Sequence, residues 1–105
     1  MANVRTKTKP FDVADHLDDD ETIAAYLTEA LQTGDAGDFA AALGDVARAR
    51  GMAQVAADTG LSREALYRTL STSGNPELST LLKIAAALEL KLVVTSGKAE
   101  EPNPV

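Results

Sequence analysis

The spacing of apolar residues along the chain predicts an all-α bundle of five or six short helices. In five segments, apolar side chains recur at the three- and four-residue intervals that place them on one face of a helix. One further helical turn is expected over residues 11–17, ahead of these segments. The five segments are Ile23 to Leu31, Phe39 to Ala47, 52–59, Arg63 to Leu70 and 76–88.

Polar residues at the ends of these segments indicate where helices begin. Asp18 and Glu21 stand three residues apart ahead of the first long helix, in the pattern of a capping box. Asp35 begins the second helix, where a carboxylate favours the positive end of the helix dipole. Asn75 is expected to cap the last helix, with Pro76 at its first position.

The pattern changes after the last helix. Leu90, Leu92 and Val94 alternate with Lys91, Val93 and Thr95, which predicts a short strand over residues 90–95. No second strand is predicted in the chain, and an unpaired apolar strand is a liability unless something covers it. We therefore expect a homodimer in which this segment pairs with its own copy.

The length of the chain, 105 residues, is enough for one domain with a modest core. That domain is expected over residues 11–96, with acidic helices at 11–50, after a flexible arm at residues 1–10 and before a disordered tail at 97–105. The chain has no Cys, which excludes disulfides and thiolate metal sites. Neither a signal peptide nor a membrane span is predicted, so the expected location is the cytoplasm.

The charged residues are unevenly distributed along the chain, whose net charge is −6. Residues 11–45 carry ten carboxylates and neither Lys nor Arg, whereas residues 46–98 carry seven cations and four carboxylates. This asymmetry suggests two partners of opposite charge. The alternative is that the acidic side chains only solvate helix faces and helix N-termini.

Residues 52–70 have the pattern of two short helices joined by a sharp turn. Val55 and Leu66 are placed to pack the two helices together. Gly60 permits the positive φ that the turn requires, and Ser62 caps the second helix. This arrangement is typical of a helix-turn-helix, whose second helix enters the major groove of DNA.

The second helix of this motif, Ser62 to Leu70, is the candidate recognition helix. Arg63 can bond a guanine through two hydrogen bonds, and Glu64 can accept one from a cytosine. Short polar side chains after this helix can contact phosphates, which position the protein without reading sequence. The predicted DNA contacts are Ser62, Arg63, Glu64, Tyr67, Arg68, Ser71, Thr72, Ser73 and Asn75.

A set of residues in and after this motif matches a known family. They are Val55, Ala56, Gly60, Leu61, Ser62, Leu66, Asn75, Pro76 and Leu81 to Ala85. With them, the chain resembles the lambda-repressor-like, Xre-type helix-turn-helix family over about residues 38–90. In many such proteins a Gln opens the first motif helix and contacts DNA. Here Met52 occupies that place, and Gln54 is two residues too close to Gly60.

A second set of matching residues extends over most of the chain. It comprises Ile23 to Leu27, Gly34, Asp35, Ala41 to Met52, Leu61 to Tyr67 and Gly74 to Pro76. With these strings the chain resembles the addiction-module antidote proteins of the HigA type. The resemblance implies an antitoxin that neutralises a small, basic toxin of the RelE/ParE superfamily and represses its own operon. The implied partners are therefore a toxin and operator DNA.

The acidic segment, residues 11–45, is the predicted surface for such a toxin. Opposite electrostatic potentials would speed encounter with a basic partner. Affinity should come from apolar anchors within it, for which the candidates are Phe11, Leu17, Tyr26 and Leu27. The competing interpretation is that these four side chains belong to the protein's own core.

Catalysis is not expected for this chain. Its one histidine, His16, stands beside Asp15 and Asp18, but a metal site needs several converging ligands, so we predict no metal and no cofactor. Two functions besides an antitoxin remain open. One is a stand-alone transcriptional regulator, and the other is a helical interaction module that does not bind DNA.

Overall fold

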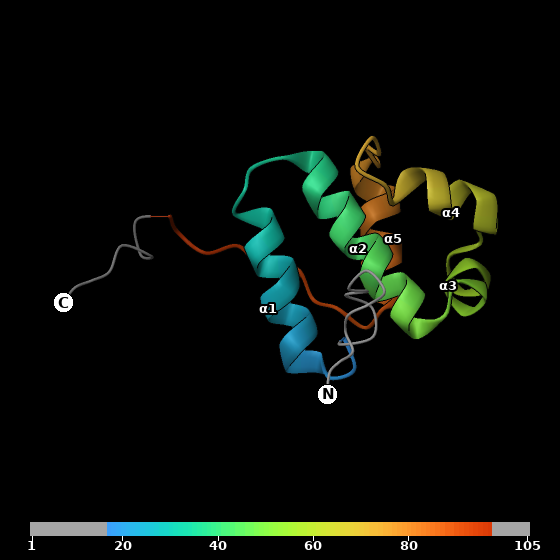
Figure 1. Cartoon of the computed structure of the whole chain (residues 1–105), viewed down its shortest axis with the longest axis horizontal. Helices are drawn as coiled ribbons and strands as arrows, with labels where there is room; N and C mark the ends of the chain where they lie inside the picture. The colour runs from blue at the N-terminus through green and yellow to red at the C-terminus, as the bar shows by residue number, and fades with distance from the viewer. Residues whose placement is uncertain (1–16, 98–105) are drawn as a thin grey trace, which may run out of the picture.

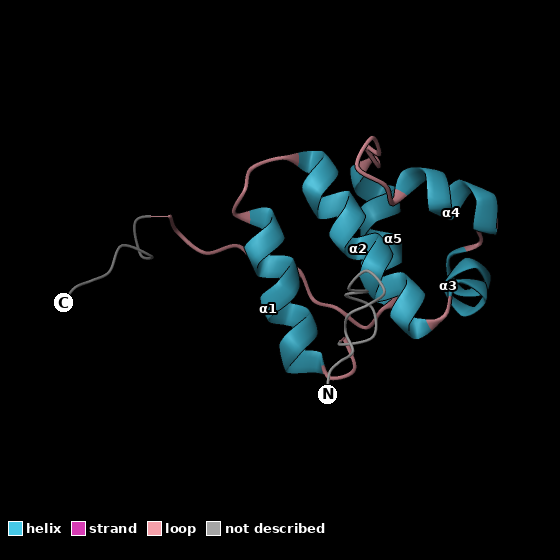
Figure 2. Cartoon of the chain, viewed as in Figure 1, coloured by secondary structure: helices cyan, strands magenta, loops and turns pink. Residues whose placement is uncertain are grey.

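The computed structural model of this chain describes residues 17–97. Within that range it contains five helices and no strand, which confirms the predicted all-α class (Figures 1 and 2). None of these helices is long and apolar enough to cross a membrane. The helices are α1 (Asp20–Leu31), α2 (Ala36–Arg50), α3 (Met52–Thr59), α4 (Arg63–Thr69) and α5 (Leu78–Ala87).

Helix α2 lies at the centre of the bundle and contacts α1, α3 and α4, while α5 packs on α3 (Figure 1). The core forms where these helices meet. Its large, fully buried side chains come from every helix of the bundle, because each apolar stripe in the sequence turns inward. They are Ile23, Leu43, Val46, Val55, Leu66, Ile84 and Leu88.

Two predicted caps are wrong by one or two residues. Asp19, not Asp18, caps α1, because the extended backbone of Asp19 lets its carboxylate accept a 2.7 Å hydrogen bond from the Thr22 N–H. Asn75 does not cap α5, which begins at Leu78. Glu77 is still extended, with ψ at 156°, so the first helical turn starts only after it.

The predicted strand over residues 90–95 is absent from the single chain. After α5, the Leu90 N–H donates to the Ala85 carbonyl at 2.8 Å, and the chain then leaves the helix without regular structure. It passes α1 and continues beyond the bundle (Figure 1). A strand needs a paired neighbour, and no other segment of residues 17–97 is a strand.

The predicted arm at residues 1–10 lies outside the described residues. So do the predicted helical turn at 11–17, except for Leu17, and the predicted tail, except for Gly97.

Candidate nucleic-acid interface

The turn between α3 and α4 has the geometry that a helix-turn-helix requires. Gly60 has a left-handed backbone with φ at 79°, as the sequence predicts for a sharp turn. The buried Thr59 reinforces the end of α3, because its hydroxyl donates to the Val55 carbonyl at 2.8 Å. The same hydroxyl oxygen accepts from the Leu61 N–H at 3.3 Å, so the turn is held from both sides.

Helix α4 has only seven residues, so packing and capping must hold it in place. Ser62 is its N-cap, and its hydroxyl accepts from the Ala65 N–H at 2.9 Å. Leu66 and Leu70 are buried in the core beneath it. The end of α4 also lies close to α2, because a Cβ added at Gly44 would stand 2.5 Å from the Leu70 carbonyl oxygen.

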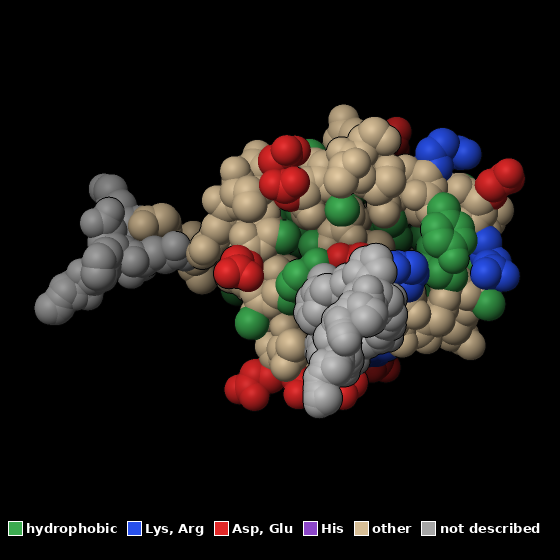
Figure 3. Space-filling view, in the orientation of Figure 1, with side chains coloured by type: hydrophobic (Ala, Val, Ile, Leu, Met, Phe, Trp, Pro, Cys, Tyr) green, Lys and Arg blue, Asp and Glu red, His purple; other side chains and the backbone are tan. Residues whose placement is uncertain are grey.

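The remaining side chains of α4 face solvent. Arg63, Glu64 and Arg68 are exposed, and Tyr67 is 49% exposed despite its large ring. Within residues 17–97 neither of the two arginines forms an ion pair. Figure 3 shows blue Lys and Arg side chains mainly on the α4 side of the visible face. The first five predicted contacts, Ser62 to Arg68, therefore form one accessible surface.

The structure places the predicted phosphate contacts after α4 in two separate locations. Thr72 and Ser73 are exposed in the loop directly after the helix. Ser71 is partly buried, and its hydroxyl donates to the Arg68 carbonyl at 3.0 Å. Asn75 lies apart from this surface, because it borders a hollow formed with α1, α2 and α5, on which Phe39 also lies.

Arg48, in the last turn of α2, is a cation beside α4 that the sequence analysis did not identify. It borders a hollow together with Tyr67 and Met52. Its guanidinium pairs with Asp45 at 2.5 Å. The Asp45 carboxylate also accepts from the Tyr26 hydroxyl at 2.5 Å, which joins α1 to α2. The three-residue spacing of Asp45 and Arg48 was the signal that could have found this pair.

The position that often holds a DNA-contacting Gln in the resembled family is buried in this chain. Met52 is only 6% exposed and belongs to the core. Gln54 is exposed, but its amide donates to the Asp58 carboxylate at 2.9 Å, one helical turn further along α3. The exposed side chains of the motif that are free to contact another molecule therefore lie on α4 rather than at the start of α3.

Tyr26 and Asp19 are titratable groups with shifted pKa values. Burial, followed by the hydrogen bond to Asp45, raises the pKa of Tyr26 to about 12. The hydrogen bond from the Thr22 backbone N–H lowers the pKa of the Asp19 carboxyl. No group of three His, Cys, Asp or Glu side chains that could hold a metal ion converges within residues 17–97.

Two of the four predicted toxin anchors are buried in the single chain. Leu17 is 4% exposed and Leu27 is 7% exposed, and both belong to the core. Tyr26 is partly buried and packs against the same core. Phe11 lies outside the described residues. Apolar residues at helical spacing on α1 face α2, and the sequence alone does not separate such residues from anchors for a partner.

The exposed charged side chains of α1 are all acidic. Exposed carboxylates gather at its start and along its outer side, and red side chains lie over α1 in Figure 3. One exposed cation reaches this end of the molecule, because Arg50 stands 3.3 Å from Asp20 and 3.8 Å from Glu89. The exposed carboxylates from Asp18 to the first turn of α2 are Asp18, Asp19, Asp20, Glu21, Glu29, Asp35 and Asp38.

Comparison with known proteins supports the resemblance to addiction-module antidote proteins. A family model described as "Probable addiction module antidote protein" matches residues 7–96. A protein of Haemophilus influenzae (strain ATCC 51907 / DSM 11121 / KW20 / Rd), described only as uncharacterized, is 48% identical over 90 residues, which cover 86% of this chain and 93% of that protein. No solved structure matches the chain. The chain therefore belongs to the family described as probable addiction module antidote proteins.

Proposed function

We propose that this chain is the antitoxin of a type II toxin–antitoxin module and that it represses its own operon through α3 and α4. The observation that carries the DNA-binding part is the exposed pair Arg63 and Arg68 on α4, neither of which forms an ion pair within residues 17–97. The left-handed turn at Gly60 and the cap at Ser62 fix the helix that presents them. Membership of the antidote family supports the antitoxin part.

On this proposal α4 enters the major groove with its N-terminal end foremost. Arg63 bonds a guanine edge and Glu64 accepts from a cytosine, because those side chains begin the exposed face of α4. Thr72 and Ser73 contact phosphates at the other end of the helix. Arg48 adds a cation beside Tyr67, at the edge of the same surface.

The test is binding of the full chain to DNA from upstream of its own gene and to random DNA of equal length, at one fixed salt concentration. We expect the upstream DNA to bind about a thousandfold tighter or more, as specific sites usually do. Equal affinity for both would contradict repression by sequence reading. No binding to either would favour the interaction module, the alternative that the sequence left open.

The proposed toxin partner is a small, basic protein of the RelE/ParE type that binds the acidic side of α1. Glu21 and Glu29 are exposed there and have no ion pair within residues 17–97. Opposite charge speeds association and keeps nucleic acid off the same face. With the antitoxin as repressor, both partners act in the cytoplasm.

Co-expression with the neighbouring reading frame, followed by co-purification, tests this part. Glu21→Lys combined with Glu29→Lys should weaken capture of the neighbouring protein and leave DNA binding near normal. Glu64→Lys on α4 is the matched control, since it changes one exposed carboxylate on the DNA side. Loss of capture with Glu64→Lys alone would contradict the proposed location, because it would mean that the toxin binds at α4 and not at α1. A neighbour that is not captured at all would favour the stand-alone regulator.

The proposed functional unit is a homodimer. One recognition helix reads only a few base pairs, so a dimer that presents two helices to half-sites about 34–36 Å apart gains useful specificity. Two-fold symmetry is the commonest way for a small protein to form such a unit.

A further inference from the structure

Three of the large apolar side chains exposed in the described part of the chain, Leu31, Leu92 and Val93, border one hollow, which Leu81 of α5 also lines. Tyr67 lies apart from them, on α4. On α5, Leu78 and Leu82 flank Leu81 on one helical face. Extensive exposed apolar surface is typical of a protein interface. We define the apolar face as the exposed large apolar side chains outside α4, with exposed fractions from 44% to 95%: Leu31, Leu78, Leu82, Leu92, Val93 and Val94.

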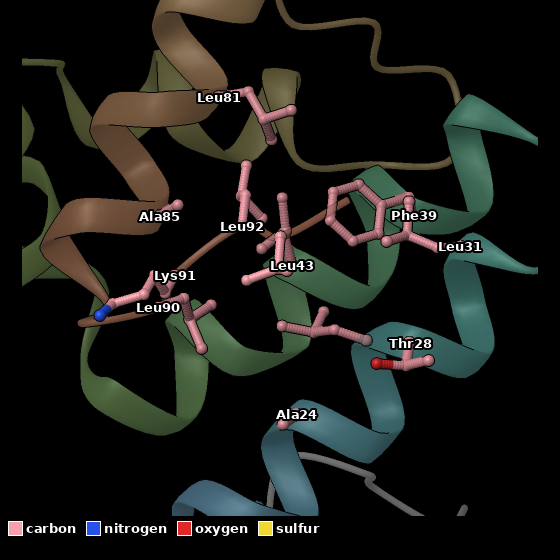
Figure 4. A pocket seen from close by; sticks show the side chains of 12 residues that line it. Ala24, Thr28, Leu31, Phe39, Leu43, Leu81, Ala85, Leu90, Lys91 and Leu92 are labelled. Carbon is pink, nitrogen blue, oxygen red and sulfur yellow. The ribbon is translucent and has the colours of Figure 1, made fainter. Parts of the chain in front are cut away.

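A hollow of about 180 Å³ lies within the apolar face, between α1, α2, α5 and the segment after α5. Figure 4 shows Phe39, Leu81 and Leu92 converging on it from three different parts of the chain. Lys91 is the one charged residue on its lining, which includes no carboxylate. A basic partner would therefore meet a like charge here, whereas the acidic surface that suits it lies elsewhere on α1.

The segment over this hollow also has an open backbone edge. The Leu90 N–H is bonded to α5, but no backbone-to-backbone hydrogen bond is made by Lys91 to Val94 within the described residues. Exposed, extended backbone with apolar side chains favours pairing with another strand. Three successive apolar side chains of this segment, Leu92, Val93 and Val94, are exposed, and Val94 is 95% exposed.

We propose that the occupant of this face is a second copy of the chain, joined by an antiparallel two-stranded ribbon in which Leu92 lies opposite Leu92 of the partner subunit. The inference deepens the proposed homodimer and rests on it. In this register the partner's Val94 lies opposite Leu90 and is carried toward the hollow. Pairing would satisfy the free backbone groups of both segments at once.

The register follows from symmetry and chemistry. In a two-fold antiparallel ribbon, an even-numbered residue lies opposite an even-numbered residue and an odd-numbered one opposite an odd-numbered one. The reason is that directly opposite side chains point to the same side of the ribbon. Centring on Leu90 is blocked by the turn at Glu89, whose φ is 61°. Centring on Lys91 sets two like charges directly opposite each other, which is destabilising.

Of the remaining centres, Leu92 and Val93 are those that pair most of the residues from Leu90 to Thr95. Centring on Leu92 pairs Leu90 with the partner's Val94, so every apolar residue of the inward side meets another. Centring on Val93 sets Leu90 opposite the partner's Ser96 and loses that match. The hydrophobic pattern, which sets register wherever one face is buried, therefore selects Leu92.

The chain has no Cys, so a single introduced Cys reports directly on this register. Directly opposite residues have Cα atoms about 4.5–5.5 Å apart, within the range of about 4.4–6.8 Å that a disulfide spans. Leu92→Cys should therefore cross-link most of the full-length chain to twice its mass of 11.0 kDa under mild oxidation. Val93→Cys is the matched control, because its two copies would be diagonal, about 7–8 Å apart.

Equal cross-linking of the two variants, or more with Val93→Cys, would overturn the register. A second variant protects the test against misfolding at position 92. Val94→Asp alters a side chain that is 95% exposed, so helical content should be unchanged while the mass in solution falls from that of a dimer to that of a monomer. A dimer that persists with Val94→Asp and fails to cross-link through Leu92→Cys would refute this interface. DNA and toxin binding by that dimer would leave the proposed function standing.

Discussion

Helices α1 and α4 both pack on α2, yet they present opposite chemistry to solvent. The outer side of α1 carries exposed carboxylates such as Glu21 and Glu29, whereas α4 exposes Arg63 and Arg68. One apolar core thus supports two surfaces of opposite charge. The net charge of −6 conceals this division, because it adds the two surfaces together.

The two helices also differ in what holds them. Helix α4 is short and depends on the Gly60 turn, the Ser62 cap and the buried Leu66. Helix α1 is longer, contacts α2 alone among the helices, and adds the hydrogen bond from Tyr26 to Asp45. Substitutions can therefore weaken either region separately.

Leu66→Ala should produce the largest loss of stability at the α4 side. The Leu66 side chain is fully buried, so truncation leaves a cavity and is expected to lower the free energy of unfolding by about 2–5 kcal/mol. Chemical denaturation followed by circular dichroism measures this. Tyr67→Ala, one residue along and half-exposed, is the control and should cost much less. Equal losses would mean that α4 is not anchored through Leu66.

Gly44→Ala should loosen the contact between α2 and α4 with a smaller effect. The added Cβ would stand 2.5 Å from the Leu70 carbonyl oxygen, so the end of α4 has to shift. Overpacking of this kind costs about 1–3 kcal/mol, which a fall in the denaturation midpoint would report. Gly60→Ala offers a contrast, because no atom lies within 4 Å of its added Cβ and only backbone strain opposes it. An unchanged midpoint with Gly44→Ala would show that the two helices are not in close contact.

Tyr26→Phe should have the smallest effect, confined to the α1 side and visible at high pH. The pKa of Tyr26 is raised from about 10 to about 12, so folding favours its protonated form. That contribution is complete below pH 10 and is lost as the pH rises through 12. The stability of the natural chain should therefore fall across this window more steeply than that of Tyr26→Phe. Parallel pH profiles would contradict the assigned role of the Tyr26 hydroxyl.

The sequence predicted the helices well because their apolar stripes and their turn residues agree. Residues 52–59 were predicted as a helix and form α3, and Gly60 and Ser62 have the predicted roles. The errors lie where two neighbours compete for one role, as Asp18 and Asp19 do for the cap of α1. The strand at 90–95 failed for a different reason, since strand formation depends on a partner that one chain does not contain.

The candidate site was predictable only in part. Positions on α4 follow from helical periodicity, which placed Arg63 and Tyr67 on the exposed face. Periodicity could not show that Leu27 faces the core rather than a partner, because both roles produce the same apolar stripe. Nor could it show that Arg48 lies next to Tyr67, which depends on how α2 and α4 meet in three dimensions.

The central claim, that α4 reads DNA, is tested most directly by Arg63→Ala assayed on DNA from upstream of the gene and on random DNA. We predict a loss of about 1–3 kcal/mol on the upstream DNA and little change on random DNA. Lys83→Ala is the matched control, since it removes one exposed positive charge on α5, outside α4 and outside the segment after α5, and should spare DNA binding. An equal loss on both DNAs would make Arg63 a phosphate contact, and no loss on either would contradict DNA reading by α4.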